Sequence, residues 1–209
     1  MALAGFQHLP GWFATEAQKD LLARIGAVIG VAPLYTPAMP RSGRPLSVRM
    51  TNCGPLGWVT DKTDGYRYQA THPVSGQPWP AIPAPLLDLW RSVAGPAALP
   101  EACLVNFYGA AARLGLHQDM DEEDRAAPVV SVSLGDDAWF RLGGTQRTDP
   151  TARLLLRSGD VVVLGGDARM AFHGVDRIRA GSSRLLADGG FPEGGRINLT
   201  LRRVSRWGG

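Results

Sequence analysis

Short apolar runs separated by turn residues dominate the second half of the chain. The runs are rich in Val, Leu, Ile or aromatic side chains and occupy residues 103–108, 129–134, 138–142, 153–156, 160–164 and 197–203. Glycine-containing turns, among them Gly143-Gly144 and Gly165-Gly166, lie between them. Short strands at this spacing are typical of an all-β barrel or sandwich. The pattern therefore predicts a mainly β fold with helices packed outside the sheets.

Two stretches of the first half have helical periodicity instead. Residues 16–29 carry apolar side chains at helical spacing, and Thr15 and Gln18 stand at the spacing of a capping box. Residues 85–93, with a proline in the first turn, form the second predicted helix. Residues 1–14 show no period, and we expect them to run over the surface.

Prolines and glycines recur between the two predicted helices. Only residues 46–50 and 58–60 have the character of strands there. Such a long stretch rich in turn residues predicts a functional lid. We expect residues 1–95 to form the N-terminal helix and lid, residues 96–209 to form the core, and both to make one compact unit linked through residues 95–100.

The composition is that of an ordinary globular protein. The chain has 209 residues, of which 44% are hydrophobic and 20% charged, enough for a proper core. We find no apolar stretch long enough to cross a bilayer, and the first residues lack the features of a secretory signal. Cys53 and Cys103 are the only cysteines and are far apart in sequence, which suits a reducing cytosol. We expect a cytoplasmic monomer without membrane association.

The net charge of +3 hides an uneven distribution. Residues 41–67 are mainly basic, whereas residues 119–124 are mainly acidic. A basic lid near an anionic substrate is one interpretation, and a solvated charged surface is the other. For Arg41 and Arg49 we expect ordinary surface cations.

Three residues have the character of a metal site. His117 and Asp119 are two apart, so that an extended segment would point both to one side, and His173 follows the strand predicted at residues 160–164. The alternative is a surface histidine in an acidic loop and a separate hydrogen-bonded His173. His8 and His72 lie in expected loops without a partner pattern, and we assign them no ligand role.

Two imidazoles and one carboxylate are the ligand set of non-haem Fe(II) oxygenases, which leave coordination positions open. A structural zinc site would instead prefer four closed ligands, often cysteines. A hydrolytic zinc site with the same three ligands stays possible at this point.

The C-terminal strand adds a second constellation. Its alternation points Arg196, Asn198, Thr200 and Arg202 to one face. Two guanidiniums on one face suit a dicarboxylate, because each can bind a carboxylate through two parallel hydrogen bonds. Asn106 and Tyr108 would also share a face, and bound 2-oxoglutarate would give these polar groups partners. A solvent-exposed polar face is the alternative, and we accept it for Arg203 and Arg206.

Motifs along most of the chain from about residue 45 resemble the AlkB family of Fe(II)/2-oxoglutarate dioxygenases. The matching blocks keep their order and spacing: MTNCGPLGW at 50–58, GYRY at 65–68, QPWP at 77–80, NFY at 106–108, LHQDMD at 116–121, VSVSLG at 130–135, GG at 143–144, GDVVV at 159–163 and RINLTLR at 196–202. The resemblance implies a double-stranded β-helix, or jelly-roll, core with an N-terminal nucleotide-recognition lid.

The resemblance also implies roles for the cofactor residues. The residues expected to bind Fe(II) are His117, Asp119 and His173. Arg196 with Tyr108 would hold the far carboxylate of 2-oxoglutarate, and Arg202 with Asn106 would hold the carboxylate nearer the metal.

Four further positions match substrate contacts of the family. Trp58 would stack the flipped, alkylated base against His117. Tyr66 would lie near the substrate phosphate, Asp121 would meet the exocyclic amine of the base, and Arg147 is either a substrate contact or a solvated loop cation.

Two positions depart from close bacterial relatives. Arg44 stands where they carry a tyrosine, and Leu164 where they carry a tryptophan. The lesion or strand preference is therefore open, whereas the core chemistry is unaffected. For Trp79 and Tyr68 we expect packing roles as aromatics of a small core.

The function implied is oxidative demethylation of 1-methyladenine or 3-methylcytosine type lesions during repair of alkylated DNA. Formaldehyde, succinate and CO2 would be released. The substrate would be single-stranded or would present a flipped base, because an N-methyl group on a paired base edge is unreachable inside a duplex. The alternatives are a 2-oxoglutarate oxygenase acting on RNA, protein or a small metabolite, and a non-catalytic jelly roll that binds nucleic acid.

Overall fold

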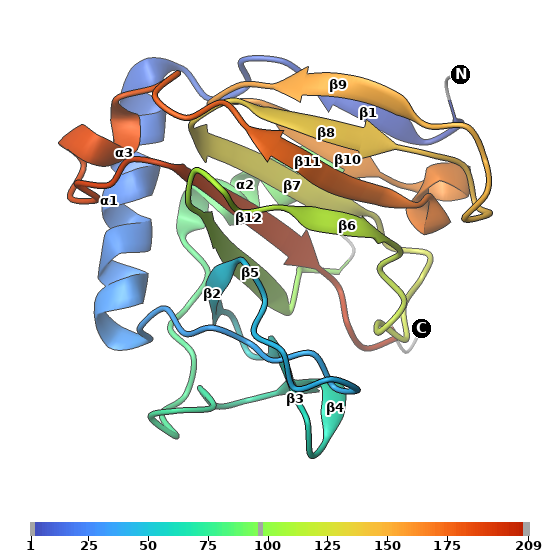
Figure 1. Ribbon diagram of the computed structural model, residues 1–209, viewed down its shortest axis with the longest axis horizontal. Helices are drawn as coiled ribbons and strands as arrows, with labels where there is room; N and C mark the ends of the chain where they lie inside the picture. Colours follow the sequence, from blue (N-terminus) through green and yellow to red (C-terminus); the bar gives the residue numbers. More distant parts are fainter. Residues whose placement is uncertain (1–2, 96–97, 207–209) are drawn as a thin grey trace.

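Two antiparallel sheets stacked face to face form the centre of the molecule (Figure 1), and the computed structural model describes residues 3–95 and 98–206. The larger sheet contains, in spatial order, β1 (Phe6–Leu9), β10 (Val161–Leu164), β7 (Val129–Gly135), β12 (Arg196–Arg202), β5 (Ala102–Tyr108) and β2 (Arg49–Cys53). The smaller sheet contains β6 (Leu114–His117), β11 (His173–Ile178), β8 (Ala138–Leu142) and β9 (Ala152–Leu156). The mainly β, double-stranded β-helix prediction is confirmed.

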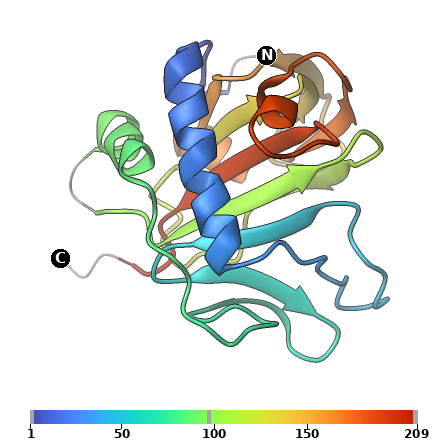
Figure 2. The same ribbon diagram turned by 90° about the vertical axis from the view of Figure 1, so that its left-hand side faces the viewer.

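Helices cover the outer face of the larger sheet. Figure 2 shows α1 (Thr15–Val31) crossing that face, with α2 (Ala84–Ala94) beside it. The helix α3 (Leu185–Asp188) and the 3-10 helix η1 (Gly166–Met170) are short. The main core lies under the helices and contains side chains of α1, α2 and α3 together with those of β5, β7, β10 and β12.

Strict alternation along β12 directs its polar side chains away from this core. Ile197, Leu199 and Leu201 pack under the helices. The polar residues between them therefore face the smaller sheet, where a second apolar cluster and the polar site share the space between the sheets. Leu164, one of the departures noted above, is buried in that second cluster.

The segment between α1 and α2 forms a lid around a hairpin of β3 (Gly57–Asp61) and β4 (Gly65–Gln69). Trp79 anchors the hairpin from behind, since its ring is buried and its Nε1 donates to the Gln69 carbonyl at 2.8 Å. A Cβ at Gly57 would come within 2.4 Å of the Trp79 ring, so only glycine fits there. The packing role predicted for Trp79 is confirmed.

The predicted helices are confirmed, but the predicted cap is wrong. Residue Ala14 is the N-cap of α1 and makes no side-chain cap bond, and Thr15 is already helical. Gln18 instead donates to the Phe13 carbonyl at 2.7 Å and accepts from the Ser158 hydroxyl at 2.6 Å. Gln18 thus joins the helix to the distant turn at Ser158, and its hydrogen bonds there replace the one expected for a capping box.

The strands predicted in the second half all exist, whereas the N-terminal strands differ from the prediction. Residues 6–9 were expected on the surface without structure, but β1 pairs with β10 and places His8 in a strand rather than a loop. The strand expected at 46–50 lies at 49–53, because β2 pairs with β5 over those residues. The strands β4, β6 and β11 were not predicted as strands.

The division into residues 1–95 and 96–209 stays a prediction, and of the expected linker, residues 96–97 lie outside the described residues. Within the described ranges, no helix combines the length and the apolar character that crossing a membrane requires.

Candidate metal and cosubstrate site

Strand pairing brings the two predicted histidine ligands together. His117 ends β6 and His173 begins β11, and the two are directly paired across these antiparallel strands. Asp119 follows two residues after His117, and one potential ligand atom from each of the three lies within 4.8 Å of the others. The His117 Nε2 is 3.7 Å from Asp119 Oδ1, and the His173 Nε2 is 3.6 Å from Asp119 Oδ2. The structure thus gathers the three residues that the sequence predicted.

Backbone carbonyls orient both imidazoles for ligation. The Nδ1 of His117 lies 2.9 Å from the Gly115 carbonyl oxygen, and that of His173 lies 3.0 Å from the Ala171 carbonyl oxygen. A carbonyl only accepts, so each Nδ1 carries the proton and each Nε2 keeps its lone pair for a metal. Burial lowers the pKa of His173 to about 4, so this ring is neutral at pH 7.

Asp119 supplies an ionised and partly unsatisfied carboxylate. It is only 5% exposed, and its Oδ1 accepts from Arg202 Nη2 at 2.6 Å. Burial would by itself raise the pKa of Asp119, but the Arg202 guanidinium and the nearby histidines hold that pKa well below its usual value. Its Oδ2 is buried without a hydrogen-bond partner among the described residues. An orphaned carboxylate oxygen beside two Nε2 lone pairs fits a divalent cation such as Fe(II).

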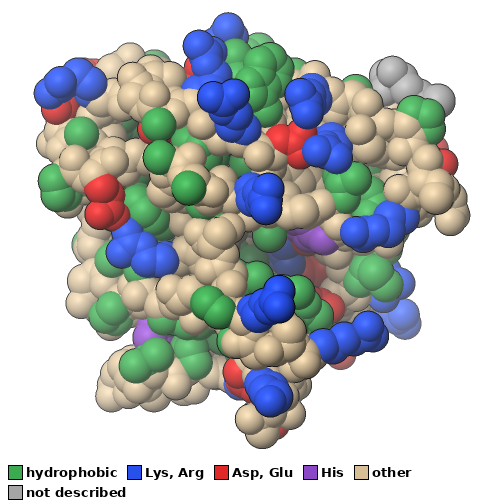
Figure 3. Space-filling view, viewed as in Figure 1, with side chains coloured by type: hydrophobic (Ala, Val, Ile, Leu, Met, Phe, Trp, Pro, Cys, Tyr) green, Lys and Arg blue, Asp and Glu red, His purple; other side chains and the backbone are tan. Residues whose placement is uncertain are grey.

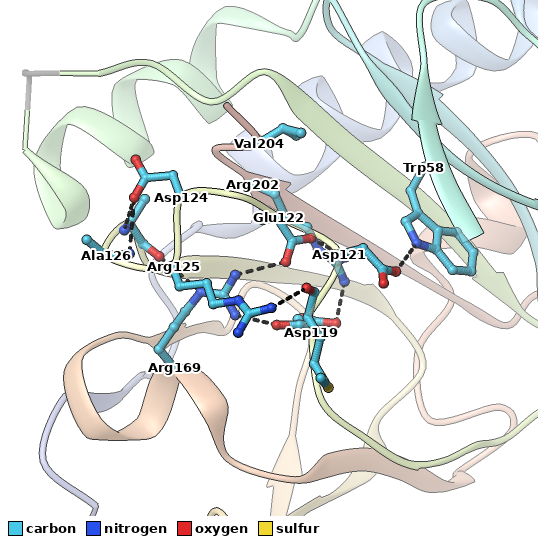
Figure 4. Close-up of polar contacts among 12 residues, drawn as sticks. Trp58, Asp119, Asp121, Glu122, Asp124, Arg125, Ala126, Arg169, Arg202 and Val204 are labelled. Atoms are coloured by element: carbon cyan, nitrogen blue, oxygen red, sulfur yellow. Dashed lines mark hydrogen bonds and ion pairs between the residues drawn. The ribbon is translucent and has the colours of Figure 1, made fainter. Parts of the chain in front are cut away.

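Arg202 is paired with protein carboxylates on two sides (Figure 4). Besides Asp119, it contacts Glu122, whose Oε1 accepts from Arg202 Nη1 at 2.8 Å. The Oε2 of Glu122 accepts from Arg169 Nη2 at 2.9 Å, and Arg169 Nη1 donates to the Asp119 carbonyl at 2.7 Å. Two arginines and two carboxylates thus balance one another, and among the described residues only Asp119 Oδ2 and the Nε of Arg202 in this group have no hydrogen-bond partner.

Sequence reasoning missed Glu122 and Arg169. Glu122 belongs to the acidic run 119–124 and resembled a solvated charge, yet it is 2% exposed. The Tyr68 hydroxyl donates to Glu122 and lies 3.2 Å from Arg202 Nη1. The packing role predicted for Tyr68 is confirmed for its ring, but its hydroxyl also joins the site, which was not predicted. The one signal in the sequence was Arg202 itself, because a buried arginine requires an acidic partner, from the protein or from a ligand.

Arg196 is buried without any carboxylate partner. It is 1% exposed, and its Nη2 donates to the Ser133 hydroxyl at 2.6 Å. Nη1 lies 3.4 Å from the Asp136 carbonyl, and Nε has no partner. Within the described residues no acidic oxygen lies within ion-pair distance of Arg196. Burial lowers the pKa of Arg196 to about 10, so the side chain is still a cation at pH 7.

Tyr108 lies beside this cation. It is buried on β5 directly opposite Arg196 on β12, and burial raises its pKa to about 12, so the hydroxyl keeps its proton. The hydroxyl makes no hydrogen bond to the described part of the chain. A buried cation and a free hydroxyl donor together form a site for an anion.

Asn198 on β12 is paired with Asn106 on β5, and Asn198 lies between Arg196 and Arg202 along its strand. The Asn198 amide donates to the Ser131 hydroxyl at 2.7 Å, and its oxygen accepts from Thr200 at 2.9 Å. The Asn106 amide has no hydrogen bond to any other described residue. Asn198 is thus fixed by its neighbours, whereas Asn106 is free to meet a ligand.

Three of the four predicted substrate residues, Trp58, Tyr66 and Asp121, are in contact with one another, whereas Arg147 contacts none of them. Trp58 Nε1 donates to Asp121 Oδ2 at 2.7 Å, and the rings of Trp58 and Tyr66 stack with centroids 5.5 Å apart. Arg147 is exposed, and its Nη1 donates to the Leu116 carbonyl at 3.2 Å. Figure 3 shows histidine and acidic surface at the bottom of a hollow, with Lys and Arg side chains at several places around the rim.

The remaining predicted histidines and cations have structural roles. His8 pairs with Asp160 at 3.0 Å, and the buried His72 contacts the Pro33 carbonyl at 2.8 Å, so both rings have partners within the protein. Arg49 is an exposed cation bonded to Glu193, as expected for a surface residue. Arg203 was expected on a solvated face, but it is half-buried and lies 3.5 Å from Glu101.

The exposed Arg44 makes backbone contacts: its N–H donates to the Ser42 hydroxyl at 3.3 Å, and its carbonyl accepts from the Met39 N–H at 2.9 Å. Its guanidinium makes no hydrogen bond or ion pair within the described ranges. The Arg44 guanidinium is therefore available to contact a ligand.

Comparison with known proteins agrees with this geometry. Residues 5–202 match the family model of the 2OG-Fe(II) oxygenase superfamily. An α-ketoglutarate-dependent dioxygenase AlkB homolog of Caulobacter vibrioides is 52% identical over 96% of this chain and 88% of its own length. The AlkB dioxygenase of Escherichia coli is 43% identical over 93% of this chain and 88% of its own length.

A solved structure gives the same assignment. The structure of OsALKBH1 superposes with a TM-score of 0.81 at 33% identity and covers 97% of this chain and 100% of its own. Sequence, fold and gathered residues thus agree, and the chain is a member of the AlkB family of α-ketoglutarate-dependent dioxygenases within the 2OG-Fe(II) oxygenase superfamily.

Proposed function

We propose that this protein removes N-linked methyl groups from bases of alkylated DNA, of the 1-methyladenine and 3-methylcytosine type, as an activity of DNA alkylation repair. It would use Fe(II), O2 and 2-oxoglutarate and release formaldehyde, succinate and CO2. The observation that carries the proposal is the buried Arg196, which has no carboxylate of its own and shares a strand face with Arg202, whose guanidinium contacts Asp119 in the cluster of three candidate metal ligands. Membership of the family removes the hydrolytic zinc and the non-catalytic alternatives.

The metal would be held by the Nε2 atoms of His117 and His173 and by a carboxylate oxygen of Asp119. Bound Fe(II) would supply the oxygen chemistry that oxidises the methyl group. The Gly115 and Ala171 carbonyls turn the two imidazoles so that each Nε2 points to the metal position, and burial keeps the His173 ring neutral. The protein holds Asp119 ionised through Arg202. The chain thus presents a neutral His173 ring and an ionised Asp119 carboxylate, the forms in which these groups bind a divalent cation.

The cosubstrate would bind along the polar face of β12. Arg196 and Tyr108 would bind the far carboxylate of 2-oxoglutarate, since both are buried donors without an anionic partner. Arg202, through its unpartnered Nε, and Asn106, through its free amide, would meet the carboxylate nearer the metal. Asn198, fixed by Ser131 and Thr200, would line the space between them.

The alkylated base would enter between lid and core. Trp58 and His117 would stack on its two faces, and Asp121 would accept from its exocyclic amine. The exposed ring of Tyr66 and the Arg147 cation would lie near the phosphates, which the basic rim of the hollow would also attract. A lesion that already breaks base pairing lowers the cost of extrusion, which favours a single-stranded or flipped substrate.

The cellular setting that we propose is a cytoplasmic monomer acting mainly on DNA, with RNA as a further possible substrate. Both cysteines are free and buried, which fits a reducing compartment. The contacts proposed above involve the base and phosphates, which DNA and RNA share. The preference between them is therefore measured by comparing activity on methylated DNA and methylated RNA.

A two-step experiment tests the proposal. Under anaerobic conditions, Fe(II) and 2-oxoglutarate together should give a weak visible charge-transfer band that neither gives alone. Formaldehyde release is then measured on methylated DNA, methylated RNA and unmodified oligonucleotides. We expect release from methylated DNA, and loss of both signals in His117→Ala and Asp119→Ala. Turnover retained in either variant would refute the metal assignment, and absence of release from every methylated oligonucleotide would refute the proposed substrate class.

A further inference from the structure

Two neighbouring contacts hold the lid hairpin to the metal-binding segment. Trp58 on β3 and Tyr68 on β4 are directly opposed in the hairpin. Asp121 and Glu122 are adjacent in the segment that follows Asp119. Trp58 donates to Asp121, and the Tyr68 hydroxyl donates to Glu122. One cross-strand pair of the lid therefore meets one pair of consecutive residues in the core.

The two contacts have opposite environments. The Trp58–Asp121 bond is exposed and joins one donor to one acceptor, so water or a base can replace either partner at small cost. Glu122 is buried and also receives hydrogen bonds from Arg202 and Arg169. Replacing the Tyr68 hydroxyl in that network leaves a buried group without its partner, so this contact does not exchange easily.

The buried contact continues to the metal ligand. Tyr68 bonds to Glu122, Glu122 receives Arg202 Nη1, and Arg202 Nη2 donates to Asp119 Oδ1 at 2.6 Å. Each of these contacts is direct; the two Arg202 contacts are buried and the Tyr68–Glu122 contact is partly buried, so water screens them weakly. A change at the lid end should therefore alter the orientation of Arg202 and of its neighbours.

We infer that Tyr68 and Glu122 are positioning residues that fix the lid on the core and set the orientation of Arg202. The neighbouring Trp58–Asp121 contact is the exchangeable part, which opens when a base takes its place. The inference rests on the proposed function, because it uses the assignment of Trp58 and Asp121 to the base and of Arg202 to the cosubstrate. It adds a division of labour between two adjacent carboxylates.

A tyrosine-to-phenylalanine pair separates this role from simple packing. Tyr68→Phe keeps the ring in its small apolar cluster and removes only the hydroxyl. Tyr35→Phe is the matched control, since Tyr35 packs in the same cluster and its buried hydroxyl has no hydrogen bond within the described residues. Neither substitution leaves Arg202 or Arg169 without a carboxylate, so both variants should fold.

The two readouts are 2-oxoglutarate affinity and coupling. Affinity is measured without nucleic acid from the visible band with Fe(II), and coupling is the succinate released per formaldehyde with a methylated oligonucleotide. We expect Tyr68→Phe to weaken 2-oxoglutarate binding about tenfold, as is usual for partners that orient a metal site, and to raise the succinate ratio. Tyr35→Phe should match the unaltered protein in both. Asp121→Asn should raise the oligonucleotide KM and leave 2-oxoglutarate affinity unchanged.

Three results would overturn the inference. They are unaltered affinity and coupling in Tyr68→Phe, a change in only one of the two, or an equal change in Tyr35→Phe. Failure of the proposed function has a different signature, because the unaltered protein would then release no formaldehyde from methylated oligonucleotides. The affinity measurement needs no nucleic acid, so in that case it still decides whether Tyr68 positions Arg202.

Discussion

Two buried arginines lie on the same face of β12 and differ in what neutralises them. Arg202, 7% exposed, has Asp119 and Glu122 as direct partners. Arg196, 1% exposed, has only the Ser133 hydroxyl and a backbone carbonyl. The pKa shifts follow the same division. Burial lowers the pKa of Arg196, whereas for Arg202 burial is outweighed by Asp119, Tyr68 and Glu122 together, which raise its pKa.

The difference indicates different tasks. A buried cation paired with carboxylates contributes to the order of the site, and removing either partner leaves the other charge uncompensated. A buried cation without an anion is held in the folded state at a cost, which a bound dicarboxylate would relieve. Arg196 is thus prepared for a ligand, while Arg202 is largely committed to the protein and keeps one nitrogen for a ligand.

The largest expected effect is on stability in the absence of cosubstrate. Arg202→Met leaves Asp119 and Glu122 with one arginine between them, so we expect the free energy of unfolding to fall by about 3–5 kcal/mol. Arg196→Met removes an uncompensated cation and should leave the free energy of unfolding unchanged or slightly higher. Urea unfolding of both variants without 2-oxoglutarate measures this. An equal loss in the two would break the comparison.

A smaller effect on stability is expected for Asp160, a buried carboxylate that accepts hydrogen bonds from backbone N–H groups. Asp160 accepts from the Gly11 and Arg157 N–H groups at 2.8 and 2.9 Å and pairs with His8. Burial opposes ionisation, but these hydrogen bonds lower the pKa of Asp160. A carboxylate with a lowered pKa stabilises the fold above the pKa of the unfolded chain, about 4, and this contribution is lost as the pH falls through the folded value.

We therefore expect Asp160→Asn to lower the free energy of unfolding by about 1–3 kcal/mol at pH 7, and by less as the pH falls below about 4. Urea unfolding across this range measures the difference, with Asp167→Asn, at an exposed position, as the control. A difference that is independent of pH would contradict the assignment. The result would sharpen the comparison of the two arginines. It tests whether hydrogen bonds from backbone N–H groups stabilise a buried carboxylate, whereas the hydrogen bonds of Arg196 leave its charge uncompensated.

The periodicity of the sequence predicted those features of the site that depend only on residues close together in the chain. The alternation along β12 and the two-residue spacing of His117 and Asp119 were sufficient to predict which side chains share a face. The resemblance predicted that His117 and His173 bind one metal, but their pairing across β6 and β11 was not predicted, because neither segment was predicted as a strand.

Distant partners explain what the sequence could not predict. Glu122 looked like one more residue of a solvated acidic run, and it is buried only because Arg169 and Arg202 arrive from other elements. Gln18 matched a capping box, but its oxygen is bonded to Ser158, 140 residues away. The four-residue strand β1 has no apolar alternation, and only its pairing with β10 makes it a strand.

The preference for a dicarboxylate tests the central claim most directly. The measurement is the affinity of the Fe(II)-loaded protein for 2-oxoglutarate and for pyruvate, which has the 2-oxoacid group but no far carboxylate, followed anaerobically by the visible band. The unaltered protein should bind 2-oxoglutarate at least about tenfold more tightly, since a charge-assisted hydrogen bond contributes about 1.5–3 kcal/mol. Arg196→Met should lose most of this preference and retain only the part that the Tyr108 hydroxyl contributes. A variant that keeps the full preference for 2-oxoglutarate would contradict the role given to Arg196.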